Sequence, residues 1–596
     1  MLNNFSLSQI KLLEGILLER QKTNHSYLMK LQNDNLLQAY YYEAGLLNPR
    51  DYNYKGKLHG GWEAIHSPIR GHFLGHFLSA ASMLYQSTKD PEIKVKVDKI
   101  VQGLGKCQME NGGEWVSPFP EKYLYWLKEG KRVGVPHYVV HKLIQGLYDA
   151  YRYAENKLAL NILDKYTNWF VRYCEQIDDK LMDQILDEET GGMLETWSYL
   201  YMETGEEKYK RLIYKYTRRQ LFDKLLDGQD VLTNMHMNTT VPEAIGMAIA
   251  YKATGDEYFR NAVMAYWEIA VDRRNSFCTG GQSSGEIWTP PGVIASRLGS
   301  KTQEHCCVYN MCKLANILFT WTGDIKYANY IELNIYNGML AQQNPRTGTP
   351  AYFLPLGPGS KKEWGSETED FWCCHGTVVE AHSSIQKYIY YRIDDSIYIS
   401  QYFSSELEEN DFTIKQIIDK QTGNIGSVTV YDSGLVNRPY SKKVILNIKC
   451  KVPKKLEIKL RVPDWISDKP IVTVNGQRVE TNESPSSWIS LNREWDNDEI
   501  VLELPYTIKG VNLPDEPNLY AFMLGPIVLA GIIDKERELE FDGQDFIELF
   551  RPYDERHWSE WRDEFITRGQ KENIKFMPLY KVFDETYTVY FPIKRI

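Results

Sequence analysis

The chain has 596 residues, of which 43% are hydrophobic and 25% are charged, the balance of a globular protein rather than a disordered or fibrous one. Its length favours two to four domains, and no run of about 18 apolar residues predicts a membrane span. The formal net charge of −10 argues against a nucleic-acid partner, because nucleic-acid binding usually needs a basic face. A small neutral or polar ligand fits better.

Up to about residue 390, apolar residues recur at the spacing of helices. Two clear examples run from Phe73 to Tyr85 and from Val139 to Tyr151. Three helical segments end in Thr-Gly, at Gly205, Gly255 and Gly323, and acidic residues follow each glycine. A glycine cap followed by an acidic helix start is typical of a helical hairpin. Repeated hairpins predict stacked helix pairs, which either close into an (α/α) barrel or stay open as a solenoid.

After residue 390 the apolar period changes to two. Apolar and polar residues alternate over 427–430, 444–448 and 456–460, which predicts half-buried strands. The pair Asn475-Gly476 lies between two further alternating segments and predicts a tight hairpin turn. Short strands of this kind predict one or two β-sandwiches.

The expected fold class is therefore mainly α with β, a helical barrel followed by β-sandwich domains. We expect a catalytic barrel over 1–390, a β-sandwich over 391–510 and a second β-sandwich or β region over 511–596, with the proline-rich stretch 505–517 at the second border. The sheet region contains a single cysteine, Cys450, so the chemistry is expected in the helical part.

The chain contains nine cysteines, an odd number at low density. The first residues show no basic segment followed by an apolar one, the pattern of a secretory signal. In such a chain cysteines are expected to be reduced thiols rather than a disulfide framework. A cytoplasmic location is the resulting expectation.

Two clusters concentrate potential metal ligands, Glu304-His305-Cys306-Cys307 and Cys373-Cys374-His375. Cysteine, histidine and carboxylate side chains are the usual ligands of zinc, so the clusters predict a zinc site. Cysteine and histidine dominate structural zinc sites, and composition alone therefore favours the set Cys306, Cys373, His305 and His375. Two pairs of buried free thiols are the alternative.

A loop rich in glycine and serine, 279–286, ends in Glu286. Such a loop does not favour burial of the carboxylate in a core. Glu286 is therefore either a general acid near the cysteine clusters or an exposed loop residue.

Several histidines lie at the expected starts of helices. His72 and His76 are four residues apart and share one face of a helix. The spacing resembles that of zinc proteases, but Phe73 stands where their general base should be, so that interpretation fails. His141 and His236 mark two other helix starts. Each of these residues either packs in the core or binds a sugar at one mouth of the barrel.

Together these motifs resemble the β-L-arabinofuranosidases of glycoside hydrolase family 127 and of the related family 146. The resemblance extends from about Gly60 through the sheet domains, and is carried by 70–76, Gly285-Glu286, Glu304-x-Cys306, 309–311 and 371–374. It implies an (α/α)6 barrel followed by β-sandwich domains. It also implies a retaining exo-glycosidase that releases terminal β-L-arabinofuranose, or a related furanose, from small oligosaccharides or glycosides.

By this resemblance, four residues hold a Zn²⁺ ion: Glu304, Cys306, Cys373 and Cys374. This set replaces the one that contains His305 and His375. The resemblance also makes Cys373 the nucleophile and Glu286 the general acid/base. The pocket side chains that it implies are Tyr352, His72, His141 and His236. Cys307 has no implied role and is expected to pack.

Two rival interpretations remain. One is a sugar epimerase or lyase on an (α/α) barrel, which would use histidines as acid and base but leaves the Glu-x-Cys and Cys-Cys elements without a role. The other is a non-catalytic carbohydrate-binding protein with structural zinc. A homodimer is a further expectation, because β-sandwich domains often mediate dimers.

Overall fold

The computed structural model describes residues 1–47, 58–418, 440–481, 483–553 and 563–595. The strand predicted at 427–430 lies outside these residues. Among the helices that are described, none is long and apolar enough to cross a membrane.

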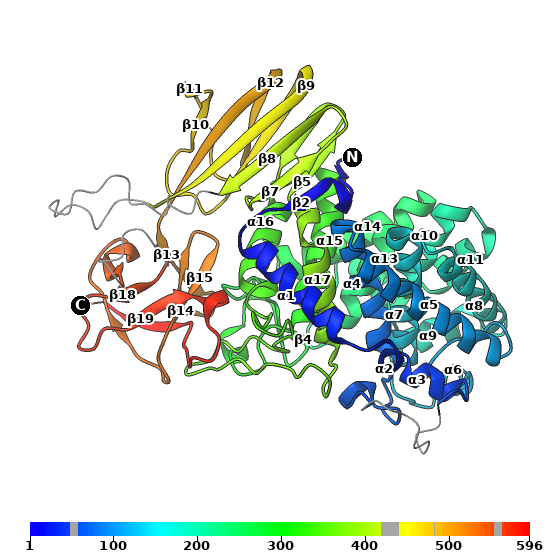
Figure 1. The fold of residues 1–596 in the computed structure, drawn as a ribbon. Helices are drawn as coiled ribbons and strands as arrows, with labels where there is room; N and C mark the ends of the chain where they lie inside the picture. Colours follow the sequence, from blue (N-terminus) through cyan, green and yellow to red (C-terminus); the bar gives the residue numbers. More distant parts are fainter. Residues whose placement is uncertain (48–57, 419–439, 482, 554–562, 596) are drawn as a thin grey trace.

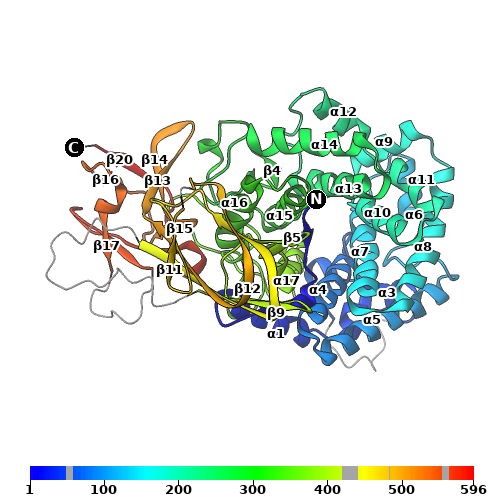
Figure 2. The same cartoon turned by 90° about the horizontal axis from the view of Figure 1, so that it is seen from above.

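The first part of the chain forms a ring of paired helices (Figures 1 and 2). The inner helices are α4 (His72–Thr88), α7 (Pro136–Ala154), α10 (Met193–Thr204), α13 (Met237–Thr254), α15 (His305–Thr322) and α17 (Cys373–Ser384). The outer helices that back them, in the same order, are α5 (Pro91–Glu110), α8 (Lys157–Glu175), α11 (Glu207–Lys215), α14 (Glu257–Trp267), α16 (Ile325–Asn334) and α1 (Ile16–Lys30). Each inner helix contacts the next, and α17 packs on α4 and closes the ring. The described residues thus confirm the (α/α)6 barrel and exclude the open solenoid.

The predicted glycine caps end three inner helices. Gly205, Gly255 and Gly323 follow α10, α13 and α15 with φ values of 69°, 72° and 68°, the left-handed conformation that glycine adopts at low cost. Shorter helices lie between the pairs: α2 (Asn33–Leu36), α3 (Gln38–Glu43), α6 (Lys122–Lys128), α9 (Asp179–Glu188) and α12 (Arg219–Leu226). The pairing of α1 with α17 joins segments from opposite ends of the helical region, so local periodicity did not predict it.

A first sheet follows the barrel. Its main path runs β1 (Asn3–Asn4), β5 (Tyr390–Ile393), β6 (Ser396–Ile399), β9 (Tyr440–Val462), β12 (Ser487–Tyr506), β10 (Ile471–Val474) and β11 (Gln477–Val479). Strands β2 (Ile10–Leu12), β7 (Ser405–Glu408) and β8 (Phe412–Ile418) extend it beside β9. The segments 444–448 and 456–460 belong to one long strand, β9, rather than to two. Asn475 and Gly476, with φ values of 52° and 76°, form the predicted hairpin turn.

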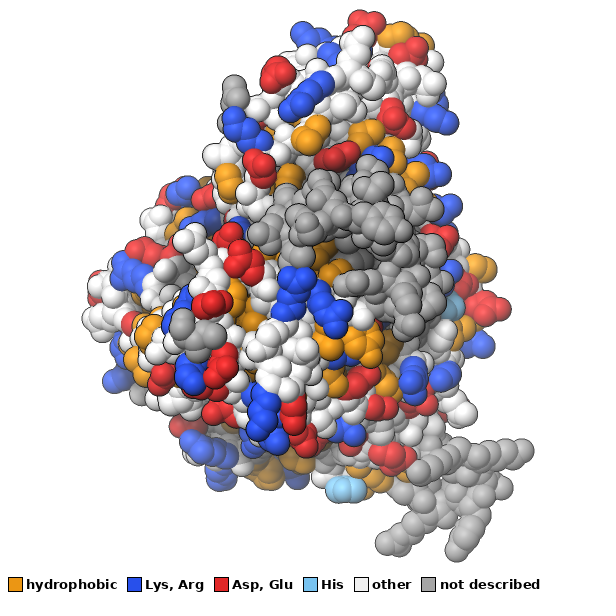
Figure 3. Space-filling model, turned by 90° about the vertical axis from the view of Figure 1, so that its left-hand side faces the viewer, with side chains coloured by type: hydrophobic (Ala, Val, Ile, Leu, Met, Phe, Trp, Pro, Cys, Tyr) orange, Lys and Arg blue, Asp and Glu red, His pale blue; other side chains and the backbone are white. Residues whose placement is uncertain are grey.

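A second sheet forms the C-terminal part. Its path is β16 (Leu539–Glu540), β20 (Phe591–Lys594), β14 (Glu516–Leu524), β15 (Ile527–Gly531), β19 (Lys575–Pro578), β18 (Phe565–Thr567) and β17 (Phe550–Pro552), with β13 (Ile508–Leu513) beside β14. Acidic and basic side chains intersperse on the face of the molecule at this side (Figure 3). The domain limits at 390 and 510 stay a prediction.

Buried polar contacts hold both sheets against the barrel. The ion pair between Arg461 of β9 and Glu332 of α16 is 2.8 Å long and almost fully buried. The Trp465 indole donates a hydrogen bond to the same Glu332 carboxylate at 2.7 Å. On the other sheet, the Asn337 amide donates to the Pro526 carbonyl at 2.7 Å and accepts from the Val528 amide at 2.8 Å.

Candidate active site

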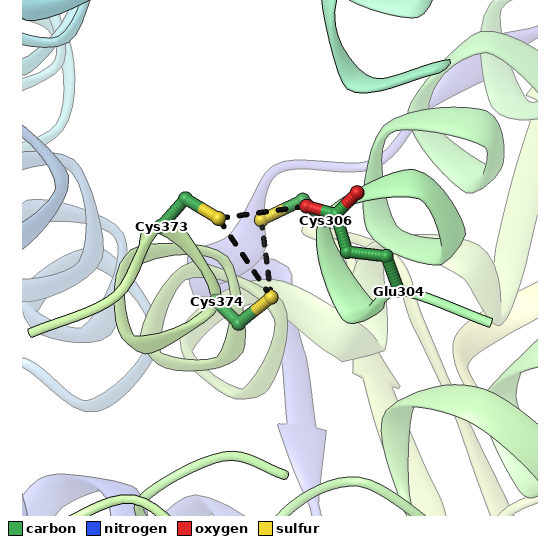
Figure 4. Close-up of side chains that lie close together, drawn as sticks. All are labelled: Glu304, Cys306, Cys373 and Cys374. Carbon is green, nitrogen blue, oxygen red and sulfur yellow. Dashed lines mark hydrogen bonds between the residues drawn. The ribbon is translucent and has the colours of Figure 1, made fainter. Parts of the chain in front are cut away.

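Two neighbouring inner helices bring the two cysteine clusters together at one mouth of the barrel. Glu304 is the N-cap of α15 and Cys306 lies in its first turn, while Cys373 and Cys374 open α17. Their four side chains point toward one another (Figure 4). One ligand atom from each residue lies within 4.8 Å of every other. Helix N-termini favour anions, so this placement favours thiolates and a carboxylate.

The geometry of the cluster fits a tetrahedral metal ion. The Cys306 and Cys374 sulfurs are 3.4 Å apart, those of Cys373 and Cys374 are 3.9 Å apart, and the Cys373 sulfur is 3.4 Å from Glu304 Oε1. Metal–ligand bonds of about 2.3 Å to sulfur and 2.1 Å to oxygen require ligand separations of about 3.6 to 3.8 Å in a tetrahedron. Three sulfurs and one carboxylate oxygen therefore form a plausible set of ligands.

The electrostatics of the cluster also call for a cation. Burial, together with the nearby Cys373 thiolate, raises the pKa of Glu304 well above its usual value. Burial likewise raises the pKa values of Cys306 and Cys374. Burial opposes ionisation of Cys373 too, but hydrogen bonds from Cys306 and Cys374 lower its pKa well below that of a free thiol. Four buried acids are costly to ionise together unless a metal ion compensates their charge.

Neighbouring side chains hold the ligand set in place. The Thr377 hydroxyl donates to the Cys306 sulfur at 3.3 Å and lies 2.9 Å from His305 Nδ1. Cys307 packs in the hydrophobic core as expected, and its thiol also donates to Glu304 Oε2 at 3.2 Å. His375 Nε2 donates to the Ser366 carbonyl at 3.0 Å and not to the cysteine cluster. Neither His305 nor His375 belongs to the cluster, so the ligand set drawn from composition was wrong.

Glu286 lies in a tight turn that faces the cluster. Strands β3 (Ser283–Ser284) and β4 (Ile287–Trp288) flank Gly285 and Glu286, whose φ values are 61° and 70°. The segment around His236 continues this small sheet, because His236 pairs with Ile287 and the Met237 amide donates to the Glu286 carbonyl at 2.9 Å. The ladder brings His236 Nε2 to 3.9 Å from Glu286 Oε2, and the Glu286 side chain stays 37% exposed, accessible to a ligand.

The Tyr352 hydroxyl lies between the two predicted catalytic groups. It donates a close hydrogen bond to Glu286 Oε1, and it lies 3.4 Å from the Cys373 sulfur. Burial and the nearby Cys373 raise the pKa of Tyr352, so the hydroxyl keeps its proton. The Tyr352 backbone pairs with the start of α15, where the His305 amide donates to its carbonyl at 3.1 Å. The Tyr352 backbone is therefore fixed relative to Glu304.

These groups line one pocket of about 330 Å³. The predicted residues on its wall are Cys373, Glu286, Tyr352, His141 and His236. His141 Nδ1 accepts from the Gly192 amide at 3.0 Å, so the proton lies on Nε2. This nitrogen is buried and has no partner among the described residues. It is a free donor for a sugar hydroxyl, and burial, with the charge of Lys142, lowers the His141 pKa and keeps the ring neutral.

The structure does not place His72 on this wall. Its side chain is fully buried, and Nε2 bonds to the Phe371 carbonyl at 2.8 Å. The pocket wall also contains Trp62, Tyr138 and Asn238, which were not predicted from the sequence. Tyr138 lies three residues before His141 on α7, so helical spacing could have identified it. Trp62 lies in the short 3-10 helix Gly61–Glu63, which is too short to give a periodic signal.

Several of the non-glycine residues with a positive φ lie around the pocket, and others lie at helix ends and turns elsewhere. Asn234, Glu286, Gln303 and Phe371 have φ values of 65°, 70°, 52° and 49°, which non-glycine residues rarely adopt. Each of them is a site residue or lies within two positions of one. Conformations of this kind persist where the surroundings fix them, and they cluster at functional sites.

The closed helical barrel carries a carboxylic acid and a buried cysteine on the wall of one small pocket, an arrangement that a glycoside hydrolase can use. Family models then give the family: residues 9–387 match the β-L-arabinofuranosidase GH127 catalytic domain, and residues 396–506 match the GH127 middle domain. The chain belongs to glycoside hydrolase family 127.

Solved structures agree in fold. A GH127 β-arabinofuranosidase is similar with a TM-score of 0.74 at 18% identity, over 100% of this chain and 98% of the other. A GH127 β-L-arabinofuranosidase from Geobacillus stearothermophilus T6 is similar with a TM-score of 0.69 at 17% identity, over 98% of this chain and 100% of the other. At this identity the likeness concerns the fold alone. No curated protein matches the chain.

Proposed function

We propose that the chain is a retaining exo-glycosidase for non-reducing terminal β-L-arabinofuranosides or a closely related furanose. Cys373 is the nucleophile and Glu286 the general acid/base in this proposal. The substrate is a small oligosaccharide or glycoside, because the pocket has the volume of a small-molecule site. A cytoplasmic location and a homodimer complete the proposal; the nine free cysteines favour the location.

The bridge through Tyr352 is the observation that carries the proposal. Its hydroxyl lies within hydrogen-bond distance of both the Cys373 sulfur and the Glu286 carboxylate. Two successive contacts of this kind span at most about 6 Å. Retaining glycosidases keep nucleophile and acid about 5 to 5.5 Å apart, whereas inverting enzymes need about 6.5 to 9.5 Å to admit a water. The spacing therefore supports retention.

Zinc is the metal that we propose for the Glu304, Cys306, Cys373 and Cys374 set. Sulfur-rich tetrahedral sites favour zinc. When bound, zinc keeps Cys373 a thiolate at neutral pH, where a free thiol with a pKa of about 8.5 would be mostly protonated. Three thiolates and a carboxylate around a divalent ion leave formal negative charge on the site, which favours a nucleophilic sulfur.

The reaction has two steps. First, the Cys373 sulfur attacks the anomeric carbon while Glu286 gives its proton to the departing glycosidic oxygen. Then Glu286, now a carboxylate, takes a proton from water, and the oxygen of that water displaces the sulfur from the same carbon. Tyr352 donates to one oxygen of the Glu286 carboxylate, and His236 Nε2 lies 3.9 Å from the other. His141 Nε2 is the donor for a hydroxyl of the bound sugar.

The first experiment combines a substrate panel with labelling of the nucleophile. The protein should be assayed against aryl β-L- and α-L-furanosides and pyranosides, with the anomeric configuration of the first product read by NMR. We expect cleavage of a β-L-furanoside with retention. A mechanism-based furanose electrophile should label Cys373 and should leave the Cys373→Ser variant unlabelled. An inverted product, or labelling elsewhere, would overturn the mechanism, and an unsaturated or epimerised product would favour the lyase or epimerase.

A further inference from the structure

The histidine pair at the start of α4 faces the nucleophile helix rather than the pocket. His72 and His76 are both buried, with exposures of 0% and 1%. Neither lines the pocket wall. Both side chains instead contact α17 or the residues directly before it. The mechanism proposed above uses neither ring.

His72 holds a strained residue just before the nucleophile. Phe371 has a φ of 49° and lies two positions before Cys373. His72 Nε2 is 2.8 Å from the Phe371 carbonyl, which can only accept, so Nε2 carries the proton. The Trp62 amide donates to the preceding carbonyl, that of Asp370, at 2.9 Å. Two consecutive carbonyls are thus fixed where the chain turns into α17.

His76 contacts the same helix farther along. Its Nδ1 is 2.5 Å from Glu380 Oε1, two turns after Cys373. Its ring also packs directly on Gly376, where a Cβ atom would come within 2.2 Å of a ring carbon. Any larger residue at 376 would push α17 away from α4. The pair therefore holds α17 at its start, at its first turn and at its second.

Tyr138 connects the two histidines. Its hydroxyl is 3.3 Å from His72 Nδ1 and 3.2 Å from His76 Nε2. Tyr138 itself lines the pocket and packs against the cysteine cluster. The rings of His72 and His76 thus lie behind the pocket wall, with Tyr138 between them and a bound sugar.

We propose that His72 and His76 are positioning residues that clamp α17 against α4, and so set the place of Cys373 and Cys374 relative to Glu304 and Cys306. This inference rests on the proposed function and assigns His72 to the nucleophile helix instead of to the sugar. It predicts that losing the clamp weakens both the metal set and the chemical step. Ground-state binding of the sugar should change little.

The test compares His72→Leu with His72→Gln, whose amide can still donate to the Phe371 carbonyl. For each full-length variant we would measure kcat, KM and zinc affinity by chelator competition. His72→Leu should lower kcat about 100-fold, the cost of misplacing a reacting group by about 1 Å, with KM nearly unchanged. Its zinc affinity should fall about 10- to 100-fold. His72→Gln should recover most of both losses.

The opposite pattern would overturn the clamp. A higher KM with unchanged kcat and zinc affinity would show that His72 contacts the sugar. Equal losses of kcat and zinc affinity in His72→Leu and His72→Gln would show that the hydrogen bond to the Phe371 carbonyl does not position α17. Circular dichroism checks folding, and Glu380→Gln, which weakens the His76 contact, carries the same test if His72→Leu does not fold. If the unchanged protein cleaves no glycoside, the proposed function fails, while the zinc affinities still test the clamp.

Discussion

The two sides of the pocket are built in opposite ways. On one side, Cys373 is buried at the start of a helix and held by the packing of α17 between α15 and α4. On the other, Glu286 is partly exposed in a two-residue turn with a positive φ, held by a short backbone ladder to the His236 segment. One side is buried, and the other is partly exposed.

This difference matches the two proposed roles. A nucleophile that must stay ionised and point at one carbon gains from burial, a metal ion and a rigid support. A general acid that must also take a proton from water needs contact with solvent. Tyr352 is the residue that touches both sides.

The largest effect is expected from a pair of adjacent cysteines on α15. Cys306→Ala removes a ligand, so the protein should lose its bound zinc and its hydrolytic activity together. Cys307→Ala removes a hydrogen bond to Glu304 Oε2 and should lower zinc affinity only about 10-fold, with activity retained at saturating zinc. Metal analysis after dialysis and an assay of each variant check this. Equal zinc loss in both variants would contradict the ligand assignment.

Glu286→Gln should impair catalysis but leave metal binding unchanged. The amide cannot donate or take the proton, so kcat should fall about 10²- to 10⁴-fold while zinc content and thermal stability stay unchanged. Substrates with a good phenolate leaving group should lose less in the first step, because that step then needs little acid assistance. If Glu286→Gln kept its activity, Glu286 would not be the general acid. If it lost zinc, Glu286 would not be independent of the metal site.

Much of the barrel follows from local sequence. Gly205, Gly255 and Gly323 mark helix ends because the caps obey backbone rules that act within a few residues. The contact of α1 with α17 does not follow, because it joins segments that are far apart in the chain. The same holds for β1, which pairs with β5. Closure of the helical barrel depends on tertiary contacts, which the spacing of apolar residues cannot predict.

The site was predictable in its types of residue and less so in its geometry. Residue chemistry alone favoured His305 and His375, but the helix starts aim Glu304 and Cys374 into the cluster and turn both histidines elsewhere. The four residues that the family resemblance named are the ones that the structure brings together. Neither residue chemistry nor the family resemblance predicted that His72 lies behind the pocket wall whereas His141 lies on it. That distinction depends on which side of the wall each ring occupies.

Tyr352→Phe tests the bridge. The ring stays, but the hydrogen bond to the Glu286 carboxylate is lost; bonds to charged groups contribute about 1.5 to 3 kcal/mol, so activity should fall about 10- to 100-fold. Tyr587→Phe is the control, since its hydroxyl donates to the Pro355 carbonyl at 2.7 Å in the contact with the second sheet. Steady-state kinetics of both variants should separate them. If Tyr352→Phe kept its full activity, the Tyr352 hydroxyl would have no part in the mechanism.

The smallest expected effect concerns the strain at Glu286. With a φ of 70°, this residue adopts a conformation that costs a non-glycine residue about 1 kcal/mol, so Glu286→Gly should raise the free energy of unfolding by about that amount while it abolishes activity. Denaturant unfolding measures the first effect and the glycosidase assay the second.

Asp394 supplies the matched control for this last prediction. It lies in the turn between β5 and β6 with a φ of 49°, in the sheet region rather than on the pocket. Asp394→Gly should therefore add a similar stability and leave activity unchanged. Glu286→Gln, which keeps the strained backbone, should lose activity without gaining stability. If Glu286→Gly gained no stability while Asp394→Gly did, the left-handed turn at Glu286 would be free of strain, and the partly exposed side of the pocket would sacrifice no stability for the placement of its acid.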